Sequence, residues 1–268
     1  MLLPVQGRRL YYDLAGPETA PVVCMTHSLS SDSGMWAEQL PPLVQAGFRV
    51  LRLDMRGHGG SDPVDGDYTM SALAEDVNAV LEALGIARVH YIGLSIGGMI
   101  GQAFAIDYPA KVASAMWCDT MPATPPGAAE VWAQRTKPVS QANSLAPIAE
   151  GTIERWLTDG FKHRNPGRWR QIRDTIVGTT PAGYLGCAAA IQNFDFGPRL
   201  HSVHAPVLVI CGEHDQGTPP AENRRLAELV SGGRYEEIAG ARHFPNVEFP
   251  DVFNKLMMDW LAEQRKAG

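Results

Sequence analysis

One short turn, Gly93–Gly97, constrains this chain more than any other feature of the sequence. Its pattern, Gly-x-Ser-x-Gly, is by itself a common glycine-rich turn. Here an apolar run over residues 89–92 predicts a strand before the turn, and residues 96–107 predict a helix after it. So sharp a turn strains the backbone at Ser95, and the two glycines remove side chains that would clash. We therefore expect the Ser95 hydroxyl to project at the edge of a sheet, beside a helix N-terminus.

Strands and helices alternate along most of the chain. Ser71 is a plausible N-cap for the helix that Gly85 closes. This alternation is typical of a parallel sheet covered by helices on both faces. The other elements are predicted as strands at 10–13 (hairpinned with the first residues), 22–26, 49–54, 112–117, 206–211 and 234–238, and as helices at 34–46, 71–84, 223–230 and 251–263.

The segment 121–196 differs from the rest because its strand signals vanish and its pattern is polar, proline-punctuated and helical. It falls between the sixth and seventh predicted strands, so it is predicted to be a helical cap, or lid, over the strand ends. Residues 1–120 and 197–268 then form one core domain. The length of 268 residues with 45% hydrophobic content suffices for one large core.

Composition argues against several classes of function. The net charge of −6 gives no support to nucleic-acid binding, which needs a basic face. No apolar run reaches the 18 residues that a membrane span needs, and the N-terminus lacks the pattern of a signal peptide. The cysteines are isolated in apolar stretches, which predicts buried thiols, a cytoplasmic location and no metal site: Cys24, Cys118, Cys187 and Cys211.

A serine hydroxyl is a weak nucleophile until a base takes its proton. His243 is the candidate base, because it alone among the eight histidines follows the final predicted strand. His27 and His214 lie at other strand ends and could approach the site, whereas His58 in a glycine-rich loop is assigned a structural role. A base must be neutral, so activity should fall as an imidazole protonates between about pH 5 and 8.

An acid must orient the imidazole and stabilise its charged form. Asp215 follows the seventh predicted strand and keeps the chain order serine, acid, histidine. Asp119, which follows the sixth strand, remains the alternative acid. The N–H groups of Leu29 and Ile96 are the candidates for an oxyanion hole, since they lie after the third strand and directly after Ser95.

Together these residues resemble the α/β-hydrolase superfamily along nearly the whole chain. Several blocks are similar to the 3-oxoadipate enol-lactonase group, although His27 stands where that group often has Asn. The block Ala115–Asp119 is similar to relatives that cleave macrolactones, with their acid at this position. The blocks shared with enol-lactonases are His27-Ser28-Leu29 with Met35-Trp36, Asp54–Gly59, Gly183–Ile191 with Asp195, and His243–Glu248.

The resemblance implies an α/β-hydrolase fold with an eight-stranded, mostly parallel sheet, and a hydrolase with no metal or cofactor. Its substrate would be a small enol-lactone bearing a carboxylate. No nucleic-acid or membrane partner is implied, and the protein could form a homo-oligomer. The substrate-binding candidates are Ser28, Trp132, Arg135 and Trp156. The other cations available in the cap are Lys137, Arg155, Lys162, Arg164, Arg168, Arg170 and Arg173.

Two other functions fit the same sequence. A carboxylesterase or perhydrolase of broad acyl scope would use the same serine, acid and histidine, so only the pocket would distinguish it. A ligand receptor that has kept the fold without catalysis is the alternative from another class. The intact set Ser95, Asp215 and His243 argues against the receptor.

Overall fold

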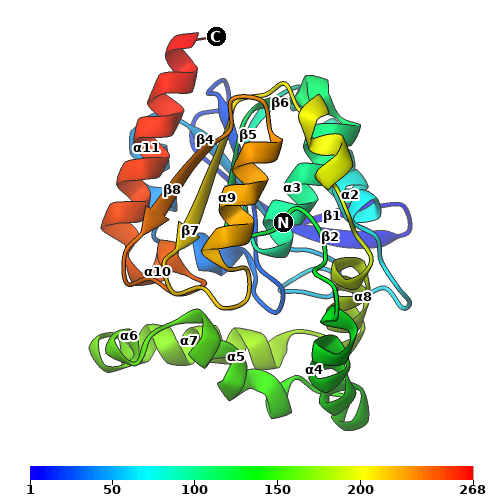
Figure 1. Cartoon of the computed structure of the whole chain (residues 1–268). Helices are drawn as coiled ribbons and strands as arrows, with labels where there is room; N and C mark the ends of the chain where they lie inside the picture. Colours follow the sequence, from blue (N-terminus) through cyan, green and yellow to red (C-terminus); the bar gives the residue numbers. More distant parts are fainter. Residues whose placement is uncertain (268) are drawn as a thin grey trace.

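A computed structural model describes residues 1–267 of the chain. Its centre is one eight-stranded sheet in the order β1-β2-β4-β3-β5-β6-β7-β8 (Figure 1). The first two strands are antiparallel to their neighbours, and the others are parallel. The strands are β1 Leu2–Val5, β2 Arg8–Ala15, β3 Val22–Thr26, β4 Arg49–Leu53, β5 Val89–Leu94, β6 Val112–Cys118, β7 Val207–Gly212 and β8 Arg234–Ile238.

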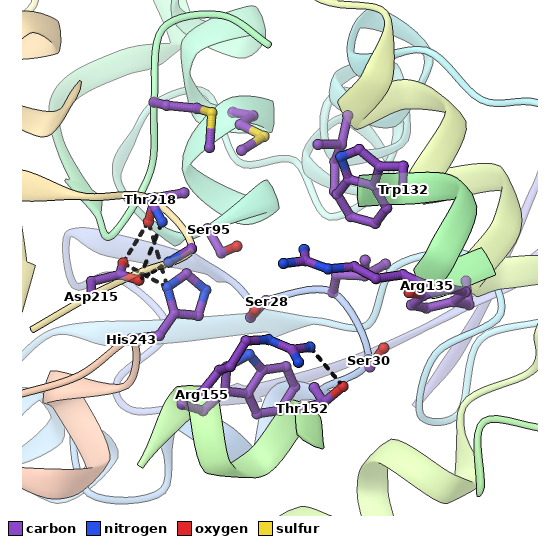
Figure 2. A pocket seen from close by; sticks show the side chains of 17 residues that line it. Ser28, Ser30, Ser95, Trp132, Arg135, Thr152, Arg155, Asp215, Thr218 and His243 are labelled. Atoms are coloured by element: carbon purple, nitrogen blue, oxygen red, sulfur yellow. Dashed lines mark hydrogen bonds and ion pairs between the residues drawn. The ribbon is translucent and has the colours of Figure 1, made fainter. Parts of the chain in front are cut away.

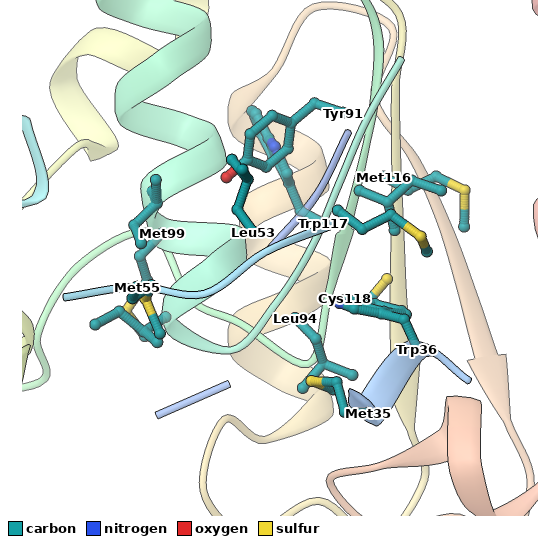
Figure 3. Packing of buried hydrophobic residues seen from close by; sticks show 14 of the residues in the cluster. Met35, Trp36, Leu53, Met55, Tyr91, Leu94, Met99, Met116, Trp117 and Cys118 are labelled. Carbon is teal, nitrogen blue, oxygen red and sulfur yellow. The ribbon is translucent and has the colours of Figure 1, made fainter. Parts of the chain in front are cut away.

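Helices cover both faces of this sheet. On one face lie α2 (Met70–Ala83), α3 (Ile96–Asp107) and α9 (Pro220–Leu229), and on the other lie α1 (Leu40–Gln45) and α11 (Pro250–Ala267) (Figure 1). The strands β3 and β5 are buried along their whole length, which is why they are apolar at every position rather than at alternate ones. Figure 3 shows part of the core, with Leu94 and Cys118 from neighbouring strands.

Two local predictions are wrong. Residues 34–46 form a 3₁₀ helix over Ser33–Trp36 and then the separate helix α1, because Pro41 and Pro42 suit the first turn of a new helix better than the interior of a longer one. The N-cap of α2 is Thr69, not Ser71, and its hydroxyl accepts a hydrogen bond from the N–H of Ala72. The predicted closing glycine, Gly85, has a φ of +66°, as this position requires.

Five further helices lie between β6 and β7 and are called the cap helices below. They form a layer at one end of the sheet, drawn in green at the bottom of Figure 1. The two ends of the segment meet at its base, where Ala123 and Asp195 form an antiparallel bridge. The cap helices are α4 Ala128–Ala142, α5 Ala149–Trp156, α6 Asp159–Arg164, α7 Pro166–Gly178 and α8 Pro181–Gln192.

The remaining short helices are α10 (Pro245–Glu248) and three 3₁₀ turns at Pro109–Lys111, Ala146–Ile148 and Gly197–Ser202. In register, Leu94 pairs with Cys118, and Cys118 pairs with Ile210. The strands β5 and β6 therefore end level with each other, and β7 ends two residues further on. The residues that follow them leave the same edge of the sheet, below which the cap helices lie.

Candidate active site

Ser95 occupies a strained position between β5 and α3. Its φ of 60° and ψ of −121° are rarely adopted by a residue with a side chain. A Cβ atom on Gly93 would lie 2.2 Å from the carbonyl oxygen of Gly97, and one on Gly97 would lie 2.4 Å from that of Thr26. Both positions therefore require glycine. The turn holds Ser95 nearly buried, with 8% of its surface exposed, at the N-terminus of α3.

His243 and Asp215 form a buried hydrogen-bonded pair. The Nδ1 atom of His243 lies 2.7 Å from Oδ2 of Asp215. The same oxygen accepts the hydroxyl of Thr218 at 2.6 Å, and Oδ1 accepts the backbone N–H groups of Gly217 and Thr218. Burial alone would raise the pKa of Asp215, but His243 and these hydrogen bonds outweigh it and hold the pKa below its usual value.

Asp119 lies behind this pair rather than in it. Its side chain is completely buried, and Oδ1 accepts the N–H of Gly212 at 2.8 Å. Burial and then the charge of Asp215 raise the pKa of Asp119 well above its usual value. Among the described residues, the carboxylate that bonds to His243 is therefore Asp215 and not the alternative acid.

The other histidines are held away from the pocket. The Nδ1 atom of His27 contacts the carbonyl of Ser28, and its Nε2 accepts the N–H of Met55 at 2.9 Å. Burial lowers the pKa of His27 to about 4 and that of His58 to about 3, so both rings are neutral supports for their loops. His214 is exposed at the surface. Neither His27 nor His214 lines the pocket described below.

A cavity separates the strand ends from the cap helices (Figure 2). It contains about 650 Å³ of space, counting its opening to solvent. Ser95 and His243 both line it. The complete lining is Ser28, Leu29, Ser30, Ser95, Met99, Met121, Trp132, Arg135, Thr152, Arg155, Trp156, Tyr184, Ile191, Asp215, Gly217, Thr218 and His243.

All four substrate-binding candidates predicted from the sequence lie on this cavity. Ser28 and Leu29 come from the loop after β3, while Trp132 and Arg135 come from α4 and Trp156 from α5. Trp156 also stacks on Phe244, with ring centroids 4.3 Å apart, so it both packs the cap against the core and faces the cavity. Ile96, the first residue of α3, presents an N–H that has no partner within the helix.

Two arginines give the cavity an excess of positive charge. Arg155 donates to the hydroxyl of Thr152 at 3.1 Å, and Arg135 lies over the ring of Trp132 at 5.2 Å. Burial and then the charge of Arg135 lower the pKa of Arg155, because two cations share one partly buried space. Neither arginine forms an ion pair with a carboxylate in residues 1–267, whereas Arg168 and Arg173 of the same cap do.

Sequence reasoning did not single out several lining residues. Arg155 was one of eight basic cap residues, and its place at the cavity depends on how α5 packs. Thr152 precedes it by one helical turn and so shares its face, a signal that could have been read from the sequence. Thr218 stands three residues after Asp215, a spacing at which a hydroxyl can bond a carboxylate within one turn.

Comparisons with known proteins agree with this fold. The family model for the alpha/beta hydrolase fold matches residues 21–250, so the chain belongs to this family. It is 31% identical over 261 residues to 3-oxoadipate enol-lactonase 1 of Acinetobacter baylyi, covering 96% of this chain and 94% of that one. A bifunctional esterase/perhydrolase of Acinetobacter calcoaceticus is 29% identical, covering 95% and 96%.

Among solved structures, the enol-lactonase from Burkholderia xenovorans LB400 superimposes with a TM-score of 0.93 and is 35% identical, covering 98% of this chain and 100% of that chain. These full-length similarities make the chain a carboxylic ester hydrolase. The described residues contain no helix that is long and apolar enough to span a membrane. The four cysteines are free and buried, as expected from the sequence.

Proposed function

We propose that this protein hydrolyses a small lactone or ester that bears a carboxylate, through an acyl-enzyme on Ser95. One observation supports this most strongly: the cavity that Ser95 shares with the Asp215–His243 pair also contains two arginines that have no carboxylate partner among residues 1–267. The names of the relatives, which include enol-lactonases, agree with the reaction and with an acidic substrate. The cytoplasmic location and the oligomeric state stay predictions.

In the first half of the proposed reaction, the Ser95 oxygen attacks the carbonyl carbon of the substrate, and its proton passes to Nε2 of His243. The N–H groups of Leu29 and Ile96 stabilise the negative charge that develops on the carbonyl oxygen. The tetrahedral intermediate then breaks its ring C–O bond. His243 returns the proton to the leaving oxygen, so the lactone opens and its acyl carbon stays on Ser95.

In the second half, water attacks the acyl carbon while His243 takes a proton from it. The bond to Ser95 breaks, His243 returns the proton to the serine oxygen, and a carboxylic acid leaves. Asp215 holds Nδ1 of His243 throughout, so that Nε2 faces the reacting atoms and the transient imidazolium is stabilised. The bond between Ser95 and the acyl carbon that forms in the first half is thus broken in the second, and the net reaction adds one water across the ring C–O bond.

Arg135 and Arg155 are the proposed binding groups for the substrate carboxylate. A guanidinium pairs with a carboxylate through two parallel hydrogen bonds, which gives orientation as well as affinity. Binding an anion would also relieve the repulsion between the two cations. The aromatic walls, Trp132 and Trp156, would hold the apolar part of the substrate.

Replacing Arg155 with Met should raise KM for a carboxylate-bearing enol-lactone by about 10- to 100-fold, the usual loss for one hydrogen bond to a charged group. The matched substrate is the same lactone with its carboxylate converted to the primary amide, for which KM should hardly change. Arg170→Met, an exposed position on α7, controls for the lost charge. Equal losses on both substrates would contradict carboxylate recognition by Arg155.

A carboxylesterase or perhydrolase of broad scope is the second candidate, favoured by the apolar share of the lining, including Met99 and Met121. A panel of short aryl esters and acidic lactones separates the two, because broad scope predicts similar kcat/KM for both classes. The non-catalytic receptor is tested by a fluorophosphonate probe, which should label the wild-type protein at Ser95. Failure of that labelling would favour the receptor.

A further inference from the structure

A second carboxyl group lies directly behind the Asp215–His243 pair. One oxygen of Asp119, one oxygen of Asp215 and one ring nitrogen of His243 all lie within 4.8 Å of one another. Asp119 has no exposed surface, and its Oδ2 has no hydrogen-bond partner among the described residues. Two carboxylates lie this close, and one of them is buried with an unpaired oxygen. Ionising both would therefore cost a large amount of free energy.

We propose that Asp119 is a positioning residue, which keeps its proton at neutral pH and donates it from Oδ2 to the carboxylate of Asp215. The proton turns the unpartnered oxygen into a donor, and Asp215 offers the acceptor. The negative charge of Asp215 is then shared, and its carboxylate is fixed from behind as well as by Thr218 and Gly217. The effect on catalysis rests on the proposed function, but the protonation of Asp119 does not.

The surroundings decide which carboxyl keeps the proton. Asp215 is stabilised as an anion by His243 and by three hydrogen bonds from Gly217 and Thr218. Asp119 receives one hydrogen bond, from the Gly212 N–H. The other titratable groups beside it are the thiols of Cys118 and Cys211, which are neutral because burial raises the pKa of each. Among the described residues, the groups that shift the pKa of Asp119 include no lysine or arginine.

The matched test is Asp119→Asn. An asparagine keeps the oxygen that accepts from Gly212 and places an N–H donor where the proposed proton lies. We expect kcat/KM to stay within about threefold of wild type, less than the loss of one hydrogen bond to a charged group. A loss of 100-fold or more would overturn the proposal, because it would show that Asp119 acts as an anion.

A stability measurement tests the proton without any assay of activity. Above the usual pKa of an aspartate, the unfolded chain loses the proton of Asp119 while the folded chain keeps it, so this group makes folding less favourable as pH rises. Asparagine carries no such proton. The difference between the melting temperature of Asp119→Asn and that of wild type should therefore increase from pH 5 to pH 8. A constant or shrinking difference would overturn the proposal.

Asp119→Leu removes the donor. The Asp215 charge is then less shared and stabilises the imidazolium of His243 more, so the acidic limb of the kcat/KM profile should move to higher pH by about half to one unit. Asp119→Asn should leave the limb in place. A limb that stays unmoved in a folded Asp119→Leu would overturn the proposal, and if that variant does not fold, the Asn variant and the melting series decide.

The same three side chains have a spacing that could hold a divalent cation. A bound cation would need Asp119 to be ionised, so it is the opposite of the proposal. The melting series is therefore repeated with EDTA, and we expect no change. A lower melting temperature in EDTA for wild type, but not for Asp119→Asn, would overturn the protonated-carboxyl interpretation. If no substrate is ever turned over, the proposed function fails while the melting series still reports on Asp119.

Discussion

Replacing Ser95 with Ala should reduce kcat for an acidic enol-lactone and for a short aryl ester by about 10⁴- to 10⁶-fold, the range that loss of a nucleophile produces in a serine hydrolase. The physical reason is that no other described hydroxyl occupies the strained turn between β5 and α3. There the backbone places one oxygen at the helix N-terminus, on the cavity that His243 also lines. Without it, the acyl-enzyme cannot form.

The experiment needs a matched serine and a check on folding. Ser140→Ala changes an exposed position on α4 and should keep wild-type activity and probe labelling. Ser95→Ala should keep a cooperative melting transition, since the smaller side chain loses no hydrogen bond that the structure contains within residues 1–267. Turnover that survives at wild-type level in pure Ser95→Ala would remove the acyl-enzyme mechanism altogether.

Replacing Asp215 with Asn should lower kcat by about 10³- to 10⁴-fold, the loss seen when a catalytic acid in such a triad becomes an amide. An asparagine in this position can donate to Nδ1 of His243, which favours the tautomer whose Nε2 carries the proton and cannot act as a base. The accompanying loss of charge also leaves the imidazolium without its partner.

The comparison with Asp119→Asn makes this result specific. Both residues are buried aspartates at the ends of neighbouring strands, yet only Asp215 contacts Nδ1 of His243, at 2.7 Å. We expect a large loss for Asp215→Asn and a small one for Asp119→Asn. The reverse order would mean that the acid follows β6, as in the macrolactone-cleaving relatives that the block Ala115–Asp119 resembles.

Much of the fold was predictable because its signals are local. The apolar runs of β3, β5 and β7 identify buried parallel strands, and the order of strands and helices follows from them. The errors were also local. Residues 34–46 carry helical spacing, but two adjacent prolines start a new helix there. Thr69 rather than Ser71 caps α2, because the chain enters that helix two residues earlier.

The candidate site was predictable in its chain order but not in its contacts. Ser95, Asp215 and His243 were found because each follows a strand, and the ends of parallel strands meet at one edge of a sheet. Asp119, His27 and His214 also follow strands. Chain order favoured Asp215 and His243 over them, but no local signal in the sequence excluded them. Side-chain direction and loop geometry made that choice, burying His27 against Met55 and leaving His214 exposed.

The sequence by itself determined the strained turn at Ser95, because its glycines are required within five residues of chain. Only the tertiary structure decided which carboxyl contacts His243 and which cap arginines reach the cavity. Those relations join positions that lie 28 residues apart for Asp215 and His243, and farther for Arg155 and Ser95. Such positions meet only when strand register and helix packing are fixed, and these depend on the whole core rather than on any one segment.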